Sequence, residues 1–391
     1  MKKKIIAVFT CICIIMSLMQ MTVATADAEN ARYIMDAETL PDNKIAVLFI
    51  KGGTSSGGVI TGGSLYYGVY DPSDNGWTEQ PVGTSAPSAK EAALALSGSA
   101  AHIAYTTADD KIAYTYQSGS GWVDAVIIES NNCNDQQGVL YAPDIAVDEE
   151  GKEHITYFDT QGAVDDYYKR DDILYANNTT GSFVKSVIAN CTGSYEAGEG
   201  GEFNEVAKPA KLAINNSGYN IVYRNHNSSR YGYGGWDHWY TLQFKSASNT
   251  SRDTNSGGAV IEACGDGAHM YTLIHENGKY IVLDGAAASG ISDKEFTNFA
   301  ADMTVSGSQI YYAAINGSNL LFCQNGTFID DKTAQTAVLN SHNKLQTVVA
   351  GGKQYILYTG ADEDNSLVIS SLSDGAVSEY SVPNIYEGTA M

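Results

Sequence analysis

The sequence predicts an all-β protein built as a β-propeller of about seven four-stranded blades. Three observations lead to this fold class. A pattern of short strands recurs along the chain, 39 glycines and 26 tyrosines accompany only 7 prolines, and no segment shows the period of a helix. Six or eight blades are also compatible with the repeat. We expect one propeller domain over residues 27–391, preceded by a signal peptide over residues 1–26.

The repeat is clearest in two neighbouring copies. Residues 92–121 read AALALSGSAAHIAYTTADDKIAYTYQSGSG, and residues 143–159 read PDIAVDEEGKEHITYFD, followed by DDILYANNTTGSF at 171–183. Each copy contains an apolar strand, a turn, a strand led by His102 or His154, and a strand that contains tyrosine. The strands led by histidine alternate apolar and polar residues, which is typical of half-buried β-strands. Four short antiparallel strands of this kind make one propeller blade.

Weaker copies extend the repeat over the whole mature chain. They predict blades at 32–83, 84–141, 142–207, 208–258, 259–300, 301–343 and 344–385. The second strand of each blade is predicted to begin at Lys44, His102, His154, Tyr219, His269, Gln309 and Gln354. In four blades the last strand opens with an aromatic residue after glycine, at Trp77, Trp122, Phe183 and Phe328.

The N-terminus has the pattern of an export signal. Lys2, Lys3 and Lys4 precede a mostly apolar run at 5–19, and Ala24-Thr25-Ala26 supplies the small residues that signal peptidase requires. We therefore expect a secreted protein with no membrane span in its mature chain. The formal net charge of −22, which becomes more negative when these lysines are removed, argues against nucleic acid as a partner.

Cysteine placement predicts one disulfide. Four cysteines remain after signal removal: Cys133, Cys191, Cys264 and Cys323. An even number in an exported chain permits two disulfides. Cys133 and Cys191 both follow the last strand of neighbouring blades, so we expect these two to pair. Cys264 with Cys323 is the remaining combination, although the repeat places them in different strands of their blades.

These repeats resemble those of secreted bacterial Asp-box propellers, the sialidase-like or BNR architecture. HIAYTTADDKIAYTYQSGSGW and HITYFD followed by DDILYANNTTGSF are similar to the second to fourth strands of that repeat, and Ser73-Asp74-Asn75-Gly76-Trp77-Thr78 looks like a degenerate Asp-box turn. The resemblance is to the architecture and not to one family. Sialidases of this group carry an Arg-Ile-Pro motif and an arginine triad. This chain has no Arg-Ile-Pro and only five arginines, so sialidase activity is not implied.

Insertion lengths distinguish the two faces of the predicted ring. Turns between first and second strands are short, whereas long segments fall between second and third strands and between blades. These segments are 51–64, 130–141, 159–172, 190–208, 224–239 and 246–258. Because antiparallel strands alternate in direction, these segments emerge on one face. Long loops on a rigid scaffold are where ligands usually bind.

The inserted segments of blades 3 and 4 supply the candidate ligand-binding residues. They are Tyr167, Tyr168, Arg170, Arg224, His226, Arg230, Tyr231, Tyr233, Trp236, His238 and Trp239, with His275 of blade 5 on the same face. Aromatic rings offer flat apolar surfaces for sugars, and neighbouring Arg and His side chains can bond hydroxyls or acidic groups. The alternative is that these rings only pack the inserted segments against their blades.

Histidine positions separate a structural set from a candidate site. His102, His154 and His269 recur at one blade position and are interpreted as structural. His226, His238 and His275 lie on the side of the insertions. If the protein is a polysaccharide lyase, Arg224, His226 and Tyr231 are the first candidates for charge neutralisation and proton transfer.

The sequence favours a carbohydrate- or glycoconjugate-recognition propeller with its site over blades 3 to 5. The alternatives are a polysaccharide lyase or glycoside hydrolase on the same face, or a protein-binding adhesion scaffold. Neither Asp165/Asp166 nor Asp171/Asp172 has a spacing that selects a catalytic pair. No metal site or cofactor is expected, and a structural Ca²⁺ lacks a supporting D-x-D-x-D-G run. The expected partner is a glycan or polysaccharide, and we expect a monomer.

Overall fold

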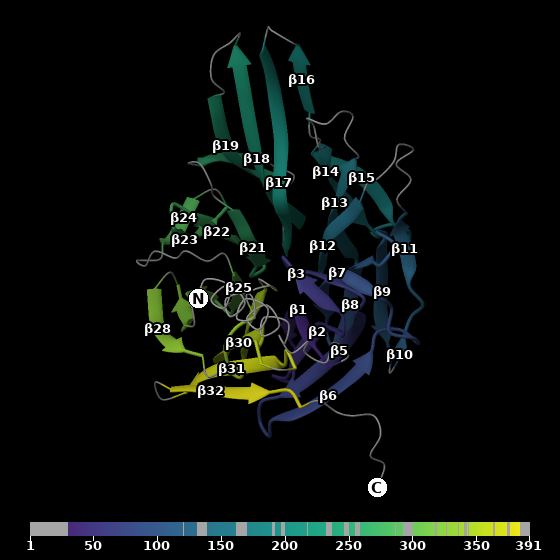
Figure 1. The fold of residues 1–391 in the computed structure, drawn as a ribbon, viewed down its shortest axis with the longest axis vertical. Coiled ribbons are helices and arrows are strands. Elements are labelled where there is room, and N and C mark those ends of the chain that lie inside the picture. The colour runs from purple at the N-terminus through teal and green to yellow at the C-terminus, as the bar shows by residue number, and fades with distance from the viewer. Residues whose placement is uncertain are drawn as a thin grey trace, which may run out of the picture.

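The computed structural model shows seven antiparallel sheets arranged in a ring, which confirms the predicted seven-bladed β-propeller (Figure 1). It describes residues 30–119, 121–130, 139–161, 170–189, 192–196, 200–216, 218–231, 237–245, 250–254, 259–285, 287–291, 300–316, 319–325, 327–334, 336–339, 342, 344–362, 364–373 and 376–383. All regular structure in these residues is β-strand. The described residues contain no helix that is long and apolar enough to cross a membrane.

Blades 1, 2 and 4 contain strands beyond the four of a regular blade, whereas blade 3 has four strands. Blade 1 contains β1 (Arg32–Thr39), β2 (Ile45–Lys51), β5 (Ser64–Asp71) and β6 (Gly76–Pro81), with a separate hairpin of β3 (Thr54–Ser56) and β4 (Val59–Thr61). Blade 2 contains β7 (Ala89–Ser97), β8 (Ala100–Thr107), β9 (Ile112–Ser118), β10 (Gly121–Trp122) and β11 (Val126–Glu129). Blade 3 contains β12 (Val139–Val147), β13 (Glu153–Gln161), β14 (Arg170–Asn177) and β15 (Val184–Ala189). Blade 4 contains β16 (Thr192–Glu196), β17 (Gly200–Asn215), β18 (Gly218–Tyr231), β19 (Asp237–Lys245) and β20 (Thr250–Thr254).

The last three blades are four-stranded and more regular. Blade 5 contains β21 (Ala259–Gly265), β22 (Met270–Glu276), β23 (Lys279–Asp284) and β24 (Ala287–Ile291). Blade 6 contains β25 (Ala301–Ser306), β26 (Gln309–Asn316), β27 (Asn319–Gln324) and β28 (Thr327–Thr333). Blade 7 contains β29 (Leu345–Ala350), β30 (Lys353–Thr359), β31 (Leu367–Ser373) and β32 (Ala376–Ser381). The second strands of all seven blades begin within two residues of the predicted positions.

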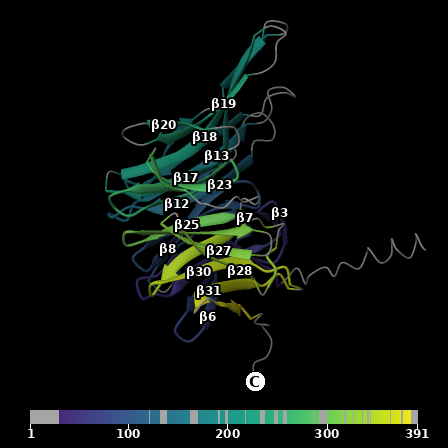
Figure 2. The same ribbon diagram turned by 90° about the vertical axis from the view of Figure 1, so that its left-hand side faces the viewer.

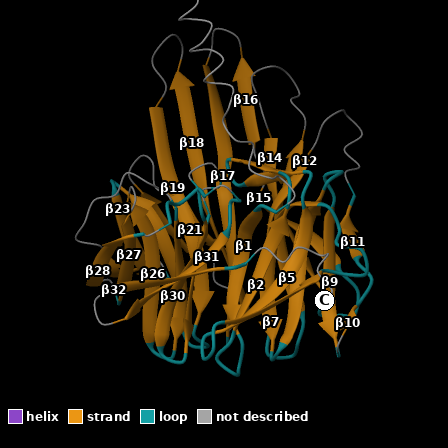
Figure 3. Ribbon diagram, turned by 60° about the horizontal axis from the view of Figure 1, so that its bottom comes forward, coloured by secondary structure: helices purple, strands orange, loops and turns teal. Residues whose placement is uncertain are grey.

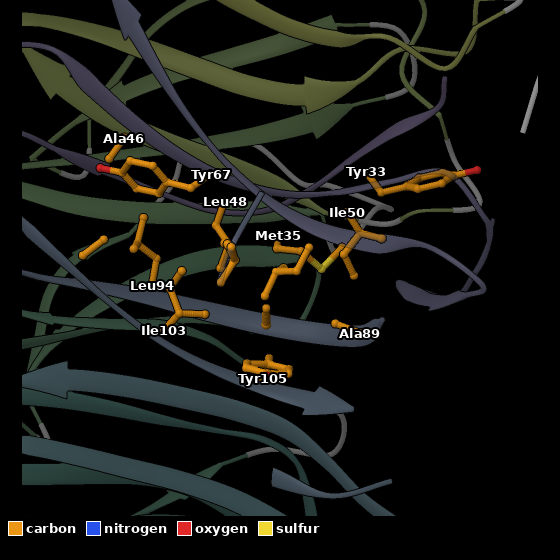
Figure 4. Packing of buried hydrophobic residues seen from close by; sticks show 14 of the residues in the cluster. Tyr33, Met35, Ala46, Leu48, Ile50, Tyr67, Ala89, Leu94, Ile103 and Tyr105 are labelled. Carbon is orange, nitrogen blue, oxygen red and sulfur yellow. The ribbon is translucent and has the colours of Figure 1, made fainter. Parts of the chain in front are cut away.

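The blades are held together by apolar side chains that fill the spaces between neighbouring sheets. Between blades 1 and 2, Leu48 and Ile50 of β2 face Leu94, Ile103 and Tyr105 of the next sheet (Figure 4). All five are at most 3% exposed. Each fully buried side chain of this size stabilises the fold by about 1.5–3 kcal/mol relative to its exposed state.

Hydrogen bonds between blade 7 and β1 close the ring. The Arg32 N–H donates to the Asn365 carbonyl at 2.9 Å. The Ile34 N–H donates to Thr359 Oγ1 at 3.1 Å, and the same hydroxyl donates to the Arg32 carbonyl at 3.1 Å. Blade 7 takes all four of its strands from the C-terminal part of the chain, so these bonds join the two ends of the propeller without a shared strand.

A buried ion cluster lies on the face of blade 1 that packs against blade 7. Arg32 is 0% exposed, and its Nε and Nη2 atoms both lie 3.2 Å from Glu79 carboxylate oxygens. Lys51 Nζ donates to the same carboxylate at 3.2 Å and Trp77 Nε1 donates at 3.0 Å. The Trp77 ring lies over Gly68, where a Cβ atom would overlap it. Glu79 thus pairs with two cations, Arg32 and Lys51.

A second polar network joins blades 2 and 3 at the opposite end of the strands. Glu153 accepts hydrogen bonds from the Tyr114 hydroxyl at 2.6 Å and from Asn178 Nδ2 at 2.9 Å. His102 Nδ1 lies 2.7 Å from the Tyr114 hydroxyl and 3.3 Å from the Glu153 carboxylate. His102 and Glu153 are each 6% exposed. This placement gives the repeated histidine a role in joining blades.

Candidate functional site

The two faces of the ring differ as the insertion lengths predict. First and second strands are joined by short turns, such as 98–99 in blade 2 and 351–352 in blade 7. In Figure 3 these turns lie at the bottom, and the strands of blade 4 rise well beyond their neighbours at the top. We call the upper side the long-segment face. Two ordered inserts define it in the residues that the structure describes: the β3–β4 hairpin and an extension of blade 4.

The blade 4 insertion is a strand extension and not the loop that the sequence suggested. β17 and β18 have 16 and 14 residues, and their pairing continues from Asn215↔Gly218 to Gly200↔Tyr231. The register shifts between Ala207 and Lys211, where the blade proper meets the extension. Figure 2 shows the extension from the side, with β18 and β19 leading into its projecting end. Continuous backbone pairing makes this element more rigid than a free loop.

Three side chains of the extension form a contact cluster, which we call the blade 4 cluster: Arg224, His226 and Tyr240. His226 pairs directly with Tyr240 across β18 and β19, and their rings stack at 4.4 Å between centroids with 12° between planes. The Arg224 guanidinium carbon lies 5.3 Å from the Tyr240 ring centroid. All three are half-buried. Burial lowers the pKa of Arg224, an effect opposed by Tyr240.

Strand alternation explains why these residues meet. Arg224 and His226 are two positions apart on β18, and Val222 on the same series packs with Leu242 and Phe244 against blade 5. The cluster therefore lies on the surface of the extension that continues the blade 5 side of the sheet. Sequence reasoning placed the end of the insertion at Trp239 and so omitted Tyr240. The signal that could have identified Tyr240 was the alternation of side chains along two paired strands, which places Tyr240 opposite His226.

The other predicted ligand-binding residues fall into three groups. The backbones of Arg230, Tyr231, His238 and Trp239 belong to β18 and β19, with His238 opposite Ser228 and Trp239 opposite Asn227. The backbone of Arg170 lies opposite Gln161 at the start of β14. Tyr167, Tyr168, Tyr233 and Trp236 lie outside the described residues.

His275 is separated from the blade 4 cluster. It is 6% exposed, and its ring contacts Tyr280 at 5.1 Å with a T-shaped geometry. Tyr280 packs into the core between blades 5 and 6. The adjacent residue on β22, Ile274, instead packs against blade 4. Alternation thus directs His275 away from the blade 4 side of its sheet.

The β3–β4 hairpin occupies the blade 1 insertion. β4 contacts β7, and Ile60 is fully buried in the core between blades 1 and 2. Ser55 Oγ lies 3.2 Å from His342 Nδ1, and His342 is itself fully buried. Burial lowers the pKa of His342 to about 3, so its ring is neutral at ordinary pH. The hairpin therefore packs over the inner strands, and its Gly58 lies close to Lys344, the residue before β29.

A central channel of about 650 Å³ runs between the seven inner strands. In five blades the register of the inner strand shifts just before a charged residue that lines the channel: Asp36, Glu91, Asp144, Lys211 and Glu262. Four channel carboxylates accept a hydrogen bond from a backbone N–H of the next blade: Asp36 from Leu94, Glu91 from Ala142, Asp144 from Leu212 and Asp302 from Thr347. These residues thus connect neighbouring blades.

Burial dominates the acid–base behaviour of the channel. It raises the pKa of Asp36 to about 7 and that of Glu38 to about 8, and it raises the pKa of Asp144 to about 6 despite the nearby Lys211 ammonium. Lys211 lies 2.6 Å from Glu262 and 3.9 Å from Asp144. Burial disfavours its charged form, but these two carboxylates outweigh that effect and raise its pKa.

We expect the protein to be more stable at about pH 5 than at about pH 8 because of these carboxyls. Their pKa values in the folded state lie above the ordinary value of about 4, so folding favours the protonated form, and stability is lost as pH rises from about 4 to the folded pKa values of about 6 to 8. Glu38→Gln should reduce the difference in melting temperature between the two conditions by about 2–4 °C. Exposed Glu150→Gln is the control. A melting temperature that rises steadily toward pH 8 would contradict this expectation.

Two cysteines are described, and both are free thiols. Cys264 of β21 lines the channel and packs against the core between blades 5 and 6, in which Cys323 of β27 is buried. The pairing of Cys264 with Cys323 is therefore wrong, because both are free thiols although they contribute to the same core. Cys133 and Cys191 lie outside the described residues. Within the described part of the chain, no group of three or more His, Cys, Asp or Glu is arranged to hold a metal ion.

Comparisons with known proteins identify a fold and no family. No protein-family model and no curated protein matches the sequence. The BP39L lectin from Burkholderia pseudomallei is similar at 11% identity and a TM-score of 0.52, over 90% of this chain and 99% of its own. The Aleuria aurantia lectin AAL shows 11% identity and a TM-score of 0.44, over 92% and 98% of the two chains. The GH93 α-L-arabinofuranosidase of Fusarium graminearum shows 10% identity and a TM-score of 0.46, over 88% and 94%.

Proposed function

We propose that this protein is a secreted carbohydrate-recognition propeller whose ligand binds on the long-segment face, at the extension of blade 4. One observation carries the proposal: on paired strands of the extension, Arg224 and His226 both contact the ring of Tyr240. Propeller folds host many functions, so the argument rests on this site and not on the likeness to lectins.

The chemistry of the blade 4 cluster suits a sugar. A guanidinium, an imidazole and a phenol hydroxyl together offer several donors and one or more acceptors for ring hydroxyls. Aromatic side chains add flat apolar surface, and their contacts with one another restrict their rotamers before a ligand arrives. Ordering the site in advance lowers the entropic cost of binding.

Tyr240→Ala is expected to weaken glycan binding by about 1–3 kcal/mol, or roughly 5- to 150-fold, because it removes the ring that both Arg224 and His226 contact. A glycan array would select the ligand, and titration calorimetry would measure the affinity of the wild type and variant. Tyr271→Ala is a matched control, because Tyr271 also stacks on a histidine, His269, at 5.7 Å but near the short-turn face. Equal affinities of wild type and a folded Tyr240→Ala variant would contradict the proposed site.

A polysaccharide lyase is the second candidate function, favoured by the same contact of Arg, His and Tyr side chains. In such an enzyme a cation neutralises the uronate carboxylate while a base removes the α-proton. Tyr240 is then a better candidate partner of Arg224 and His226 than Tyr231, because its contact with both is observed. Incubating the bound polysaccharide with the protein and following the absorbance of unsaturated uronates would separate turnover from binding alone.

A further inference from the structure

Basic residues are scarce on this chain, and most of its arginines lie near blade 4. The full chain carries 45 acidic residues against 23 basic ones. Only five arginines occur, and four of them lie between residues 170 and 252: Arg170, Arg224, Arg230 and Arg252. The fifth, Arg32, is fully buried in its ion pair with Glu79 on blade 1. The other four arginines are therefore concentrated in blades 3 and 4.

Strand register brings two of these arginine positions into one row of the blade 4 sheet. Arg224 on β18 is opposite Leu242 on β19, and Leu242 is in turn opposite Arg252 on β20. Arg230 follows further along β18 within the extension. The row that contains His226 and Tyr240 lies two rows further toward the tip of the extension. Arg224 and Arg252 thus share one row, and Arg230 lies six positions beyond Arg224 on the same strand.

Arginine is suited to one class of sugar substituent. Its planar guanidinium presents N–H donors in a fork that matches the two oxygens of a carboxylate or sulfate, and such charge-assisted bonds are stronger than those to neutral hydroxyls. The Tyr240 ring on which Arg224 lies restricts the orientation of the guanidinium. An ordered, half-buried guanidinium pairs with an anion more favourably than a fully hydrated one does.

The overall charge makes this local chemistry necessary for such a ligand. At a formal net charge of −22 the surface repels polyanions. A neutral glycan would experience no such repulsion and would need no cationic site. Arginines gathered in one part of an acidic protein can offset this repulsion where the ligand carries negative charge.

We propose that the ligand of the blade 4 extension is an anionic glycan, bearing a uronate carboxylate or a sulfate group, and that Arg224 pairs with that group. This inference rests on the proposed carbohydrate-recognition function and specifies the ligand class. A uronate carboxylate and a sulfate group both present two oxygens that can accept hydrogen bonds from one guanidinium. The experiment tests carboxylated and sulfated ligands separately.

The experiment compares three oligosaccharides of equal length: a neutral one, one containing uronate, and one containing sulfate. Titration calorimetry on the full mature chain is expected to give the tightest binding for one of the anionic ligands, with affinity that falls as salt is raised. Arg224→Gln should weaken that binding roughly 10- to 100-fold, because the charged pair is lost. Arg224→Lys should restore only part of the affinity, since an ammonium cannot form the bidentate pair.

Lys245→Gln is the matched control, because it removes one positive charge from the neighbouring strand β19, at the end nearer the blade, opposite Ile221. It should leave the affinity for the anionic ligand within about two-fold of the wild type, since charges at a distance are screened by salt. Circular dichroism on each variant would establish that the fold is retained.

The outcomes distinguish this inference from the function on which it rests. Binding of the neutral oligosaccharide with equal or greater affinity, unchanged by Arg224→Gln, would overturn the anionic ligand and leave carbohydrate recognition intact. Silence toward all three oligosaccharides and toward a broad glycan array would overturn both. Equal losses in Arg224→Gln and Lys245→Gln would also overturn the inference, because general charge would then explain the effect.

Discussion

Replacing Glu79 by glutamine is expected to lower the free energy of unfolding by about 3–5 kcal/mol, the cost of leaving a buried charge without its partner. The carboxylate of Glu79 accepts hydrogen bonds from Arg32, Lys51 and Trp77, and its own side chain is only 9% exposed. A neutral amide keeps the size of the side chain but removes the negative charge that pairs with the fully buried guanidinium of Arg32. Because Arg32 is also where β1 meets blade 7, loss of this pair weakens the closure of the ring.

Urea unfolding followed by tryptophan fluorescence would measure this loss of stability. Asp109→Asn is the control, since Asp109 pairs with Lys111 at the surface with side chains 64% and 38% exposed. Surface pairs of this kind contribute about 0–1 kcal/mol. A Glu79→Gln variant that unfolds at nearly the wild-type urea concentration would show that water, and not the protein, neutralises Arg32.

The second large effect is expected at Glu153, where stability should depend on pH in the direction opposite to that of the channel. Burial by itself would raise the pKa of Glu153, but hydrogen bonds from His102, Tyr114 and Asn178 outweigh it and lower the pKa to about 2. The folded state therefore favours the ionised carboxylate. Its contribution, about 3 kcal/mol from the size of the shift, is present above the ordinary pKa and is lost as pH falls from about 4.5 toward 2.

Glu153→Gln should remove this acid-side dependence and lower stability at neutral pH by a similar amount. Thermal unfolding of both proteins between about pH 2 and pH 6 would test it, because the two stability curves should converge at low pH. Glu150→Gln, three residues earlier on an exposed turn, serves as the control. Parallel curves for wild type and Glu153→Gln across this range would refute the role assigned to the His102–Tyr114–Glu153 network.

Much of the fold was predictable because a propeller repeats one local pattern. Alternation of apolar and polar residues specifies a strand, and glycine-containing turns separate strands. The local sequence of each blade therefore specifies the strands of that blade. The starts of β8, β13 and β26 follow from the residues around His102, His154 and Gln309 alone. The same repetition identified the structural histidines, of which His102 and His154 are buried between blades.

The candidate site was only partly predictable. Sequence reasoning identified Arg224 and His226 from their unusual concentration, but it described their segment as a loop and grouped them with His275. A stretch of polar and aromatic residues can belong to a loop or to a paired strand. A strand that extends above the ring packs against no apolar core, so its sequence lacks the alternation of apolar and polar residues that marks a half-buried strand. Tyr240 was missed for that reason, since its role depends on a partner on another strand.

The sequence by itself determined the all-β class, the strand starts, and the distribution of long and short connections. These properties depend on neighbouring residues, and local physics is sufficient for them. Only the tertiary structure decided that there are seven blades, that Cys264 and Cys323 remain free thiols, and that Tyr240 contacts both Arg224 and His226. It also decided that register shifts in the inner strands bring Asp36 and Asp144 into the channel, where burial changes their pKa values. These features depend on register and on the packing of one blade against the next, which join residues distant in the chain.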